Sequence, residues 1–160
     1  MTKGKSPRLP RSERPRKPAA SVSQARRHAR EVVVKTLYET DLGVLSREEA
    51  EGRITRRLAR TADREFALDL LRRTLDNLAR IDEVIAAVAE NWELKRMAAM
   101  DLNTLRLGAA EIMFAGVPAK VAINEAIEIA KKFSTENSGG FVNGILDRVA
   151  RTNREIRDNL

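Results

Sequence analysis

The chain has 160 residues, with 30 Lys and Arg against 23 Asp and Glu, one histidine and no cysteine, so its formal net charge is +7. At this length we expect one domain with a core of ordinary size, and the absence of cysteine excludes disulfides, thiolate catalysis and Cys-ligated zinc. With a single histidine, no apolar run of roughly 18 residues and no secretory signal, the sequence predicts a cytoplasmic protein without a membrane span, metal or cofactor.

The excess positive charge lies at the N-terminal end of the chain. Residues 1–30 contain ten Lys and Arg and one acid, whereas residues 31–160 contain 20 bases and 22 acids. Four of the five prolines fall in the first 18 residues, so we expect residues 1–21 to form a disordered basic arm. The asymmetry indicates an anionic partner, and nucleic acid rather than a membrane, because no bulky apolar anchors accompany the charge. A solubilising tail is the alternative.

The remainder of the chain has the composition of a helical domain. No proline occurs between Ala19 and Val117, and Ala, Leu, Arg and Glu dominate this stretch. No segment alternates convincingly between apolar and polar residues, as a strand would. We therefore expect an all-α domain over residues 22–155, followed by a C-terminal tail over residues 156–160. Seven helices with short connections predict a compact bundle.

Cap residues and apolar spacing place these helices. The pattern Ser46-x-x-Glu49 is a capping box, in which both side chains satisfy backbone amides at the start of a helix. Gly43 and Pro118 are expected to follow helix ends. The expected limits, in chain order, are Ser23–Asp41, a second helix from Ser46, a third from Asp63, a fourth from Asp82, Ala98–Phe114, Ala119–Phe133, and a last helix after the loop Asn137–Gly140.

The first helix carries the clearest functional signal. Arg26, Arg27 and Arg30 follow the basic arm directly, and Tyr38 lies eleven residues after Arg27. Eleven residues are about three helical turns, so Arg27 and Tyr38 share a face and lie about 16 Å apart along the axis. Guanidinium groups bind phosphates, and a tyrosine ring stacks on an unpaired base. The pattern predicts a surface for RNA or single-stranded DNA; a solvated basic face is the alternative.

For four residues in the second half of the chain, the residue type and the neighbouring sequence predict whether the side chain is buried and what it binds. Trp92 is expected in the core, as is usual for tryptophan in helical proteins. Asp101 lies in the polar phase of its helix, available for a local ion pair or a basic partner. Asn124 and Asn143 are flanked by apolar residues, which predicts that both are partly buried and hydrogen-bonded.

Several segments together resemble the NusB family of bacterial transcription antitermination factors, over roughly residues 25–150. Their order and spacing along the chain carry the resemblance. They are Ala25-Arg26-Arg27-His28-Ala29-Arg30-Glu31 with Leu37-Tyr38; Trp92-x-Leu94-x-Arg96 with Asp101; Leu105-Arg106-Leu107 with Glu111; Val117-Pro118 through Ala122-Ile123-Asn124-Glu125-Ala126 to Ala130-Lys131; and Phe141-Val142-Asn143-Gly144.

The resemblance implies an all-α fold of two helical subdomains, no enzymatic activity, and binding of the boxA RNA element of ribosomal RNA operons. It also implies joint action with NusE, a protein of the small ribosomal subunit, in the antitermination complex of RNA polymerase, which promotes rRNA transcription. The residues it assigns are Arg26, Arg27, Arg30, Tyr38 and Phe141 for single-stranded boxA RNA, and Asp101 and Arg96 for NusE.

Two positions depart from the family pattern. His28 stands where an arginine is common, and Gly139-Gly140 replaces a stretch that often carries a cation, so we expect weaker RNA contacts at both. Proteins of this kind occur as monomers and as homodimers, and the sequence leaves that choice open. Two other functions also stay open: a helical adaptor without RNA contact, and a stand-alone relative of the N-terminal domain of rRNA cytosine methyltransferases, enzymes that need a catalytic cysteine.

Overall fold

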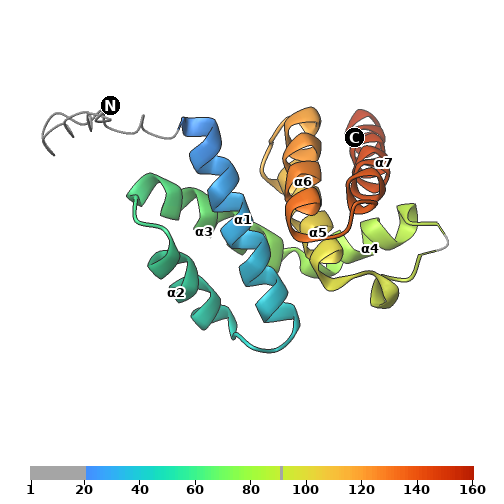
Figure 1. The fold of residues 1–160 in the computed structure, drawn as a ribbon. Coiled ribbons are helices and arrows are strands. Elements are labelled where there is room, and N and C mark those ends of the chain that lie inside the picture. Colours follow the sequence, from blue (N-terminus) through green and yellow to red (C-terminus); the bar gives the residue numbers. More distant parts are fainter. Residues whose placement is uncertain (1–20, 91) are drawn as a thin grey trace, which may run out of the picture.

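The computed structural model describes residues 21–90 and 92–160, and over these ranges it consists of helices and their connections, without strands (Figure 1). None of these helices is long and apolar enough to cross a membrane. The expected basic arm over residues 1–21 lies, except for Ser21, outside the described residues. The helices are α1 (Val22–Asp41), α2 (Arg47–Arg57), α3 (Thr61–Asp76), α4 (Leu78–Val88), the 3-10 turn η2 (Leu94–Arg96), α5 (Ala99–Phe114), α6 (Ala119–Phe133) and α7 (Ser138–Asp158).

The expectation of an all-α bundle of about seven helices is confirmed for the described residues, and the caps explain where two helices begin. Ser46 Oγ accepts from the Glu49 amide at 3.2 Å, while the Glu49 carboxylate accepts from the Ser46 amide at 2.7 Å, which is the predicted capping box. The predicted cap at Ser23 is wrong. Ser21 caps α1 instead, because Gln24 lies three residues later and completes a second reciprocal pair.

Two boundaries in the rest of the chain differ from expectation. The break between α3 and α4 falls at Asn77 rather than at Asp82, and the Asn77 side chain donates to the Arg73 carbonyl at 2.8 Å, where it satisfies a group at the end of α3. The last helix, α7, includes Gly139 and Gly140 in its first turn and continues to Asp158, so most of the expected tail is helical.

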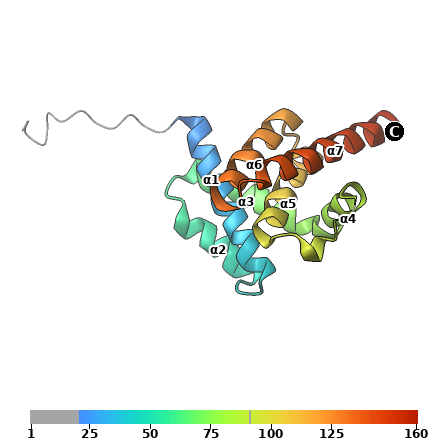
Figure 2. The same cartoon turned by 45° about the vertical axis from the view of Figure 1, so that its right-hand side comes forward.

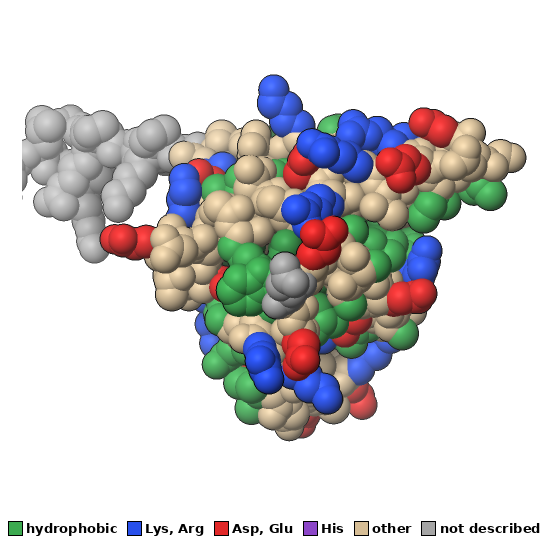
Figure 3. All heavy atoms as spheres, turned by 90° about the vertical axis from the view of Figure 1, so that its right-hand side faces the viewer, with side chains coloured by type: hydrophobic (Ala, Val, Ile, Leu, Met, Phe, Trp, Pro, Cys, Tyr) green, Lys and Arg blue, Asp and Glu red, His purple; other side chains and the backbone are tan. Residues whose placement is uncertain are grey.

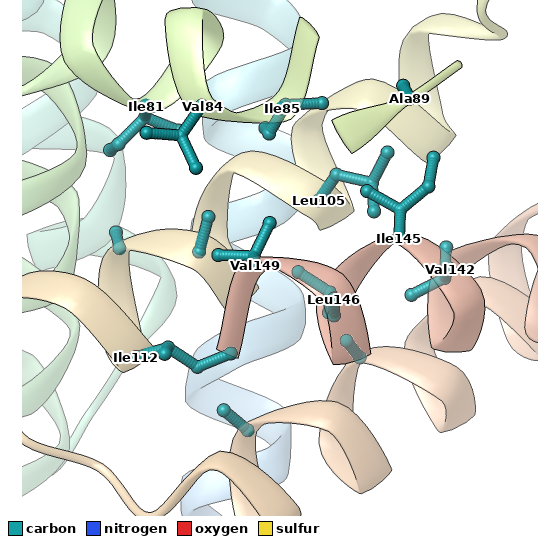
Figure 4. Close-up of a cluster of buried hydrophobic side chains, with 14 of the residues drawn as sticks. Ile81, Val84, Ile85, Ala89, Leu105, Ile112, Val142, Ile145, Leu146 and Val149 are labelled. Atoms are coloured by element: carbon teal, nitrogen blue, oxygen red, sulfur yellow. The ribbon is translucent and has the colours of Figure 1, made fainter. Parts of the chain in front are cut away.

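Two apolar cores divide the bundle into two subdomains. In Figure 1, α1–α3 lie on one side and α4–α7 on the other, and Figure 2 shows α7 extending to its C-terminal end away from α1–α3. The first core contains the fully buried side chains of Ile54 and Leu71 among others, and the second those of Ile85, Leu105 and Leu146 (Figure 4). The central helix α5 contributes to both cores.

Buried arginines on α1 and α5 join the two subdomains. Arg30 of α1 binds the carboxylate of Glu111 on α5 through Nε and Nη2, each at 2.9 Å from an oxygen. Arg106 of α5 binds both oxygens of Asp82 on α4 at 2.8 Å and lies 3.1 Å from Asp41 at the end of α1. The relative position of α1, where the functional signal lies, is therefore fixed by buried charges as well as by apolar packing.

Gly108, in the middle of α5, allows α7 to approach closely. A Cβ at this position would lie 2.6 Å from Cδ1 of Leu146, which is fully buried and cannot turn away without displacing its neighbours. We expect Gly108→Ala to reduce the free energy of unfolding by about 1–3 kcal/mol, measured by urea denaturation. Gly144→Ala is the control, because nothing lies within 4 Å of its added methyl and alanine favours the helix. Equal effects of the two substitutions would contradict this account.

Candidate nucleic-acid interface

Three residues of α1 lie on one side of the helix at helical spacing, and we call them the α1 stripe: Arg27, Lys35 and Tyr38. The guanidinium of Arg27 donates to both carboxylate oxygens of Glu125 on α6, at 2.9 and 3.1 Å, and its side chain remains 43% exposed. The hydrogen bond to Glu125 and the charge of that carboxylate raise the pKa of Arg27. Tyr38 is half-buried, so part of its ring is accessible.

The expectation that Arg30 contacts phosphates is wrong. Its side chain is 6% exposed, and its guanidinium is bound to Glu111, whose side chain is only 2% exposed. Burial raises the pKa of Glu111, and the hydrogen bond and charge of Arg30 oppose this rise. Arg30 therefore holds α1 against α5, because position 30 faces the interior of the bundle while Arg26 and Arg27 lie nearer the surface.

Arg26 is exposed and is positioned by an aromatic ring of α3. The Arg26 guanidinium lies 5.0 Å from the ring centroid of Phe66, and that of Arg30 lies 5.1 Å from the same ring. Arg26 forms no ion pair with any of the described residues, so its charge is available to a ligand. The cation–π contact limits its motion without neutralising it.

A second aromatic ring supports the α1 stripe at the end of α6. Nζ of Lys35 lies 4.5 Å from the ring centroid of Phe133, and Nζ of Lys132 lies 5.3 Å from it. Lys132 also binds the carboxylate of Glu31 at 3.0 Å, so its charge is already matched. Lys35 has no such carboxylate among the described residues, so its charge on this surface is unmatched.

A hollow of about 250 Å³ lies where the segment after α4 meets the starts of α5 and α7. We call it the aromatic hollow, because the rings of Trp92 and Phe141 line it with centroids 5.3 Å apart and planes at 65°. Trp92 is 56% exposed, so the expectation that it is a core residue is wrong. It lies in the irregular segment after α4, where no helix covers it. The lining residues are Trp92, Arg96, Met97, Ala98, Asp101, Thr135, Asn137, Ser138 and Phe141.

A second depression lies beside the first. It is bounded by the end of α4 and by Gly140 and Gly144, and Trp92 and Phe141 line this depression too. Figure 3 shows the side of the molecule that carries α4 and α7, with hydrophobic side chains gathered in the middle of the face between charged groups. Trp92 and Phe141 thus line both depressions.

Asp101 supplies a hydrogen-bond acceptor at the aromatic hollow. The residue is only 9% exposed, so the expectation of an outward-facing acid in the polar phase of α5 is wrong. Its Oδ2 accepts from the Ser138 hydroxyl at 3.2 Å, while Oδ1 is buried and has no hydrogen-bond partner among the described residues. An unsatisfied buried carboxylate oxygen costs free energy unless a ligand or water donates to it.

The other expected residues lie on the outer surface. Arg96 of η2 has a side chain 80% exposed, 3.6 Å from Glu93, at the rim of the aromatic hollow. Asn124 and Asn143 are exposed, so the expectation that they are partly buried is wrong. Both lie on outward faces of α6 and α7, and their apolar neighbours face inward.

The end of α6 links the α1 stripe to the aromatic hollow. Lys35 of the stripe contacts Phe133, the last residue of α6, and Thr135, two residues later, lines the hollow. Together these two regions hold cations, the exposed ring of Trp92, half-buried aromatic rings and one buried, unpaired acceptor. Cations hold a phosphate backbone, aromatic rings stack on unpaired bases, and an acceptor reads a base edge.

Comparison with protein families finds a match to the NusB family over residues 27–151. The chain is 41% identical over 132 residues to the transcription antitermination protein NusB of Anaeromyxobacter dehalogenans, an alignment that covers 81% of this chain and 92% of the relative. It is 43% identical over 129 residues to the NusB protein of Salinibacter ruber, which covers 78% of this chain and 80% of the relative.

Solved structures give the same result. The NusB protein of T. maritima is 40% identical and superposes with a TM-score of 0.70, over 79% of this chain and 90% of that one. A chain in a crystal structure of the antitermination factors NusB and NusE in complex with double-stranded RNA is 26% identical, with a TM-score of 0.71. That match covers 80% of this chain and 97% of the other.

Proposed function

The chain belongs to the NusB family of transcription antitermination proteins, and on this premise we propose that it binds the boxA RNA of ribosomal RNA operons jointly with NusE. The relative that was solved in a complex with NusE and RNA supports both partners. The observation that carries the proposal is the pair of regions linked by the end of α6, the α1 stripe and the aromatic hollow, where cations lie beside aromatic rings. Bound there, the protein would act within the antitermination complex of RNA polymerase and promote rRNA transcription.

In this proposal each accessible residue has a distinct role toward a single strand. Arg26 and Arg27 hold phosphates. Arg27 does so either by leaving Glu125 for the phosphate or by binding both at the same time. Tyr38 stacks on one base, and Phe141 stacks on another in the aromatic hollow. Arg30 has no role toward RNA, because its guanidinium is buried against Glu111.

We place the contact with NusE at the rim of the aromatic hollow, around Arg96. Its side chain and that of Glu93 are 80% and 70% exposed, so both are accessible to a protein partner. Asp101 is too deeply buried for a direct contact with a flat protein surface, and in this proposal it acts on a group that enters the hollow. A homodimer that covered α1 would compete with RNA for the same surface.

Two substitutions in the α1 stripe are expected to weaken RNA binding in different ways. Arg27→Ala should lower the salt dependence of binding by about 0.7 in log–log slope, because one phosphate contact to a single strand is lost. Tyr38→Ala should cost about 1–3 kcal/mol of binding free energy with an unchanged slope, because stacking releases no counterions. Both are measured by titrating a boxA-type strand and a scrambled strand over a range of salt concentrations, with and without NusE.

Arg80→Ala is the matched control for these variants. Arg80 is also ion-paired with a glutamate and its side chain is 50% exposed, but it lies on α4, away from the stripe. We expect it to bind like the unmodified protein. If folded Arg27→Ala and Tyr38→Ala proteins bind boxA RNA with unaltered affinity and salt dependence in the presence of NusE, the RNA surface is elsewhere. If the unmodified protein binds NusE but no RNA, the chain is a helical adaptor.

A further inference from the structure

A separate hollow of about 260 Å³ lies between α1 and α2, on the opposite side of Lys35 from Tyr38. We call it the α1–α2 groove. No Phe, Tyr or Trp side chain lines it, in contrast to the aromatic hollow, and its one aromatic ring is the imidazole of His28. Its lining residues are His28, Val32, Lys35, Thr36, Glu39, Arg53 and Arg57.

The α1–α2 groove carries an excess of positive charge. Its only carboxylate among the described residues is Glu39, which Arg53 binds at 2.7 Å in a half-buried ion pair. Arg57 and Lys35 have no carboxylate partner in the described part of the chain. Arg57 is also the last residue of α2, one turn after Arg53, so both guanidinium groups project from the same side of that helix.

The other side of α2 differs, because its charges are balanced. Toward α3, Arg47 binds Asp76 at 2.6 Å and Arg72 binds Glu51 at 2.6 Å. Arg47 and Arg72 thus each have an acid opposite them, whereas beside α1 the only carboxylate of the groove, Glu39, binds Arg53 and leaves Arg57 without a partner among the described residues. Among the described residues, two arginines of α2 have no ion pair: Arg57, which lines the groove, and Arg56, which does not.

We propose that the α1–α2 groove binds backbone phosphates of RNA that continues past the α1 stripe. The inference rests on the proposed function, since Lys35 belongs to both surfaces and a strand that leaves the stripe there enters the groove directly. Lys35 and Arg57 contact phosphates. Arg53 adds a further phosphate contact when its guanidinium binds Glu39 and a phosphate at the same time. Because the groove is lined chiefly by cations and has no Phe, Tyr or Trp side chain, it holds the phosphate backbone, which lengthens the site without adding sequence preference.

Two lengths of RNA test the α1–α2 groove. One is a minimal boxA-type strand, and the other is that strand extended by about ten nucleotides at either end, a length chosen to pass beyond one helix–helix groove. The unmodified protein is expected to bind one of the extended strands more tightly and with a steeper salt dependence. Arg57→Gln is expected to lower affinity for that extended strand about three- to tenfold and its salt slope by about 0.7, with the minimal strand unaffected.

Arg56→Gln is the matched control for Arg57→Gln. It removes the same charge from the neighbouring, exposed residue of α2, which does not line the groove. We expect its effect on the extended strand to stay under about twofold, as for a charge that is not in contact with a phosphate. Equal losses for both variants would show a general charge effect and overturn the proposal.

Glu39→Gln is expected to change the affinity for the extended strand in the opposite direction to Arg57→Gln. It removes the carboxylate that competes for Arg53, so affinity for the extended strand should rise and its salt slope should increase. If the unmodified protein binds minimal and extended strands equally, or if Glu39→Gln weakens the extended complex, the groove does not bind RNA. If it binds neither strand, with or without NusE, the proposed function itself fails.

Discussion

Arg30→Met is expected to lower the free energy of unfolding at pH 7 by about 3–5 kcal/mol, because it leaves a buried carboxylate without its partner. Glu111 is 1% exposed, and the Arg30 guanidinium supplies all three of its side-chain hydrogen bonds among the described residues. Methionine fills a similar volume but cannot donate a hydrogen bond. Urea denaturation followed by circular dichroism measures the loss.

The loss of unfolding free energy in Arg30→Met should also depend on pH. Burial raises the pKa of Glu111 from its ordinary value of 4.5, and Arg30 opposes that rise, so removal of Arg30 raises this pKa further. A carboxyl group whose pKa is higher in the folded state takes up a proton on folding. Stability therefore falls as pH rises from about 4.5 through the raised pKa, and Arg30→Met should be less destabilised at pH 5 than at pH 7.

The double variant Arg30→Met with Glu111→Gln is the control. It removes the charge that the single variant leaves buried, so it should recover part of the stability at pH 7 and lose most of the added pH dependence. A loss below about 1 kcal/mol that is the same at both pH values would contradict a buried ion pair. If the single variant were fully stable but defective in RNA binding, Arg30 would be an RNA contact after all.

The three arginines at the start of the first helix show what local sequence can and cannot predict. Helical spacing correctly placed Arg27 on the surface near Tyr38, because both follow from the period of one helix. It could not separate Arg30 from them, because the partner of Arg30 lies 81 residues away in the sequence. Knowing that position 30 faces inward requires knowing which side of α1 packs on α5.

The errors at Asp101 and Trp92 have different causes. All residues of α5 from Asp101 to Ile112 are buried, because other helices surround α5. Helical periodicity therefore cannot identify an exposed polar side on this helix. For Trp92, the general preference of tryptophan for the core predicts burial, whereas the side chain is 56% exposed. The acids Glu90 and Glu93 on either side of it are the sequence signal for an exposed connection, since Glu is rarely found in a buried segment.

Trp92→Ala is expected to weaken binding of boxA-type RNA about 5- to 150-fold, which corresponds to about 1–3 kcal/mol for one lost base stack. The salt slope should remain unchanged, because the ring contacts no phosphate. More than half of the side chain is exposed, so the folded structure should lose little stability. Trp92→Phe retains an aromatic face and should recover most of the affinity, which separates stacking from a general disturbance of the hollow.

Leu42→Ala is a matched control for the loss of an exposed apolar group. Leu42 is 54% exposed, close to the 56% of Trp92, but it follows α1 in the connection to α2 and does not line the aromatic hollow. We expect it to bind RNA normally. If Trp92→Ala also binds RNA normally while NusE binding is lost, the aromatic pair belongs to the protein interface and the proposed base contact at Phe141 is wrong.

Asp101→Asn tests whether the aromatic hollow distinguishes bases. The unpaired Oδ1 can only accept, so it favours a base edge that presents an amino or imino donor, whereas an amide at this position both donates and accepts. The variant keeps the shape of the side chain and the contact with Ser138, so the fold should be preserved. Titration of strands that differ at one base should show discrimination reduced by about 1–3 kcal/mol at a single position, with other positions unchanged. Uniform weakening at every position would instead mean that Asp101 only supports the start of α7 through Ser138.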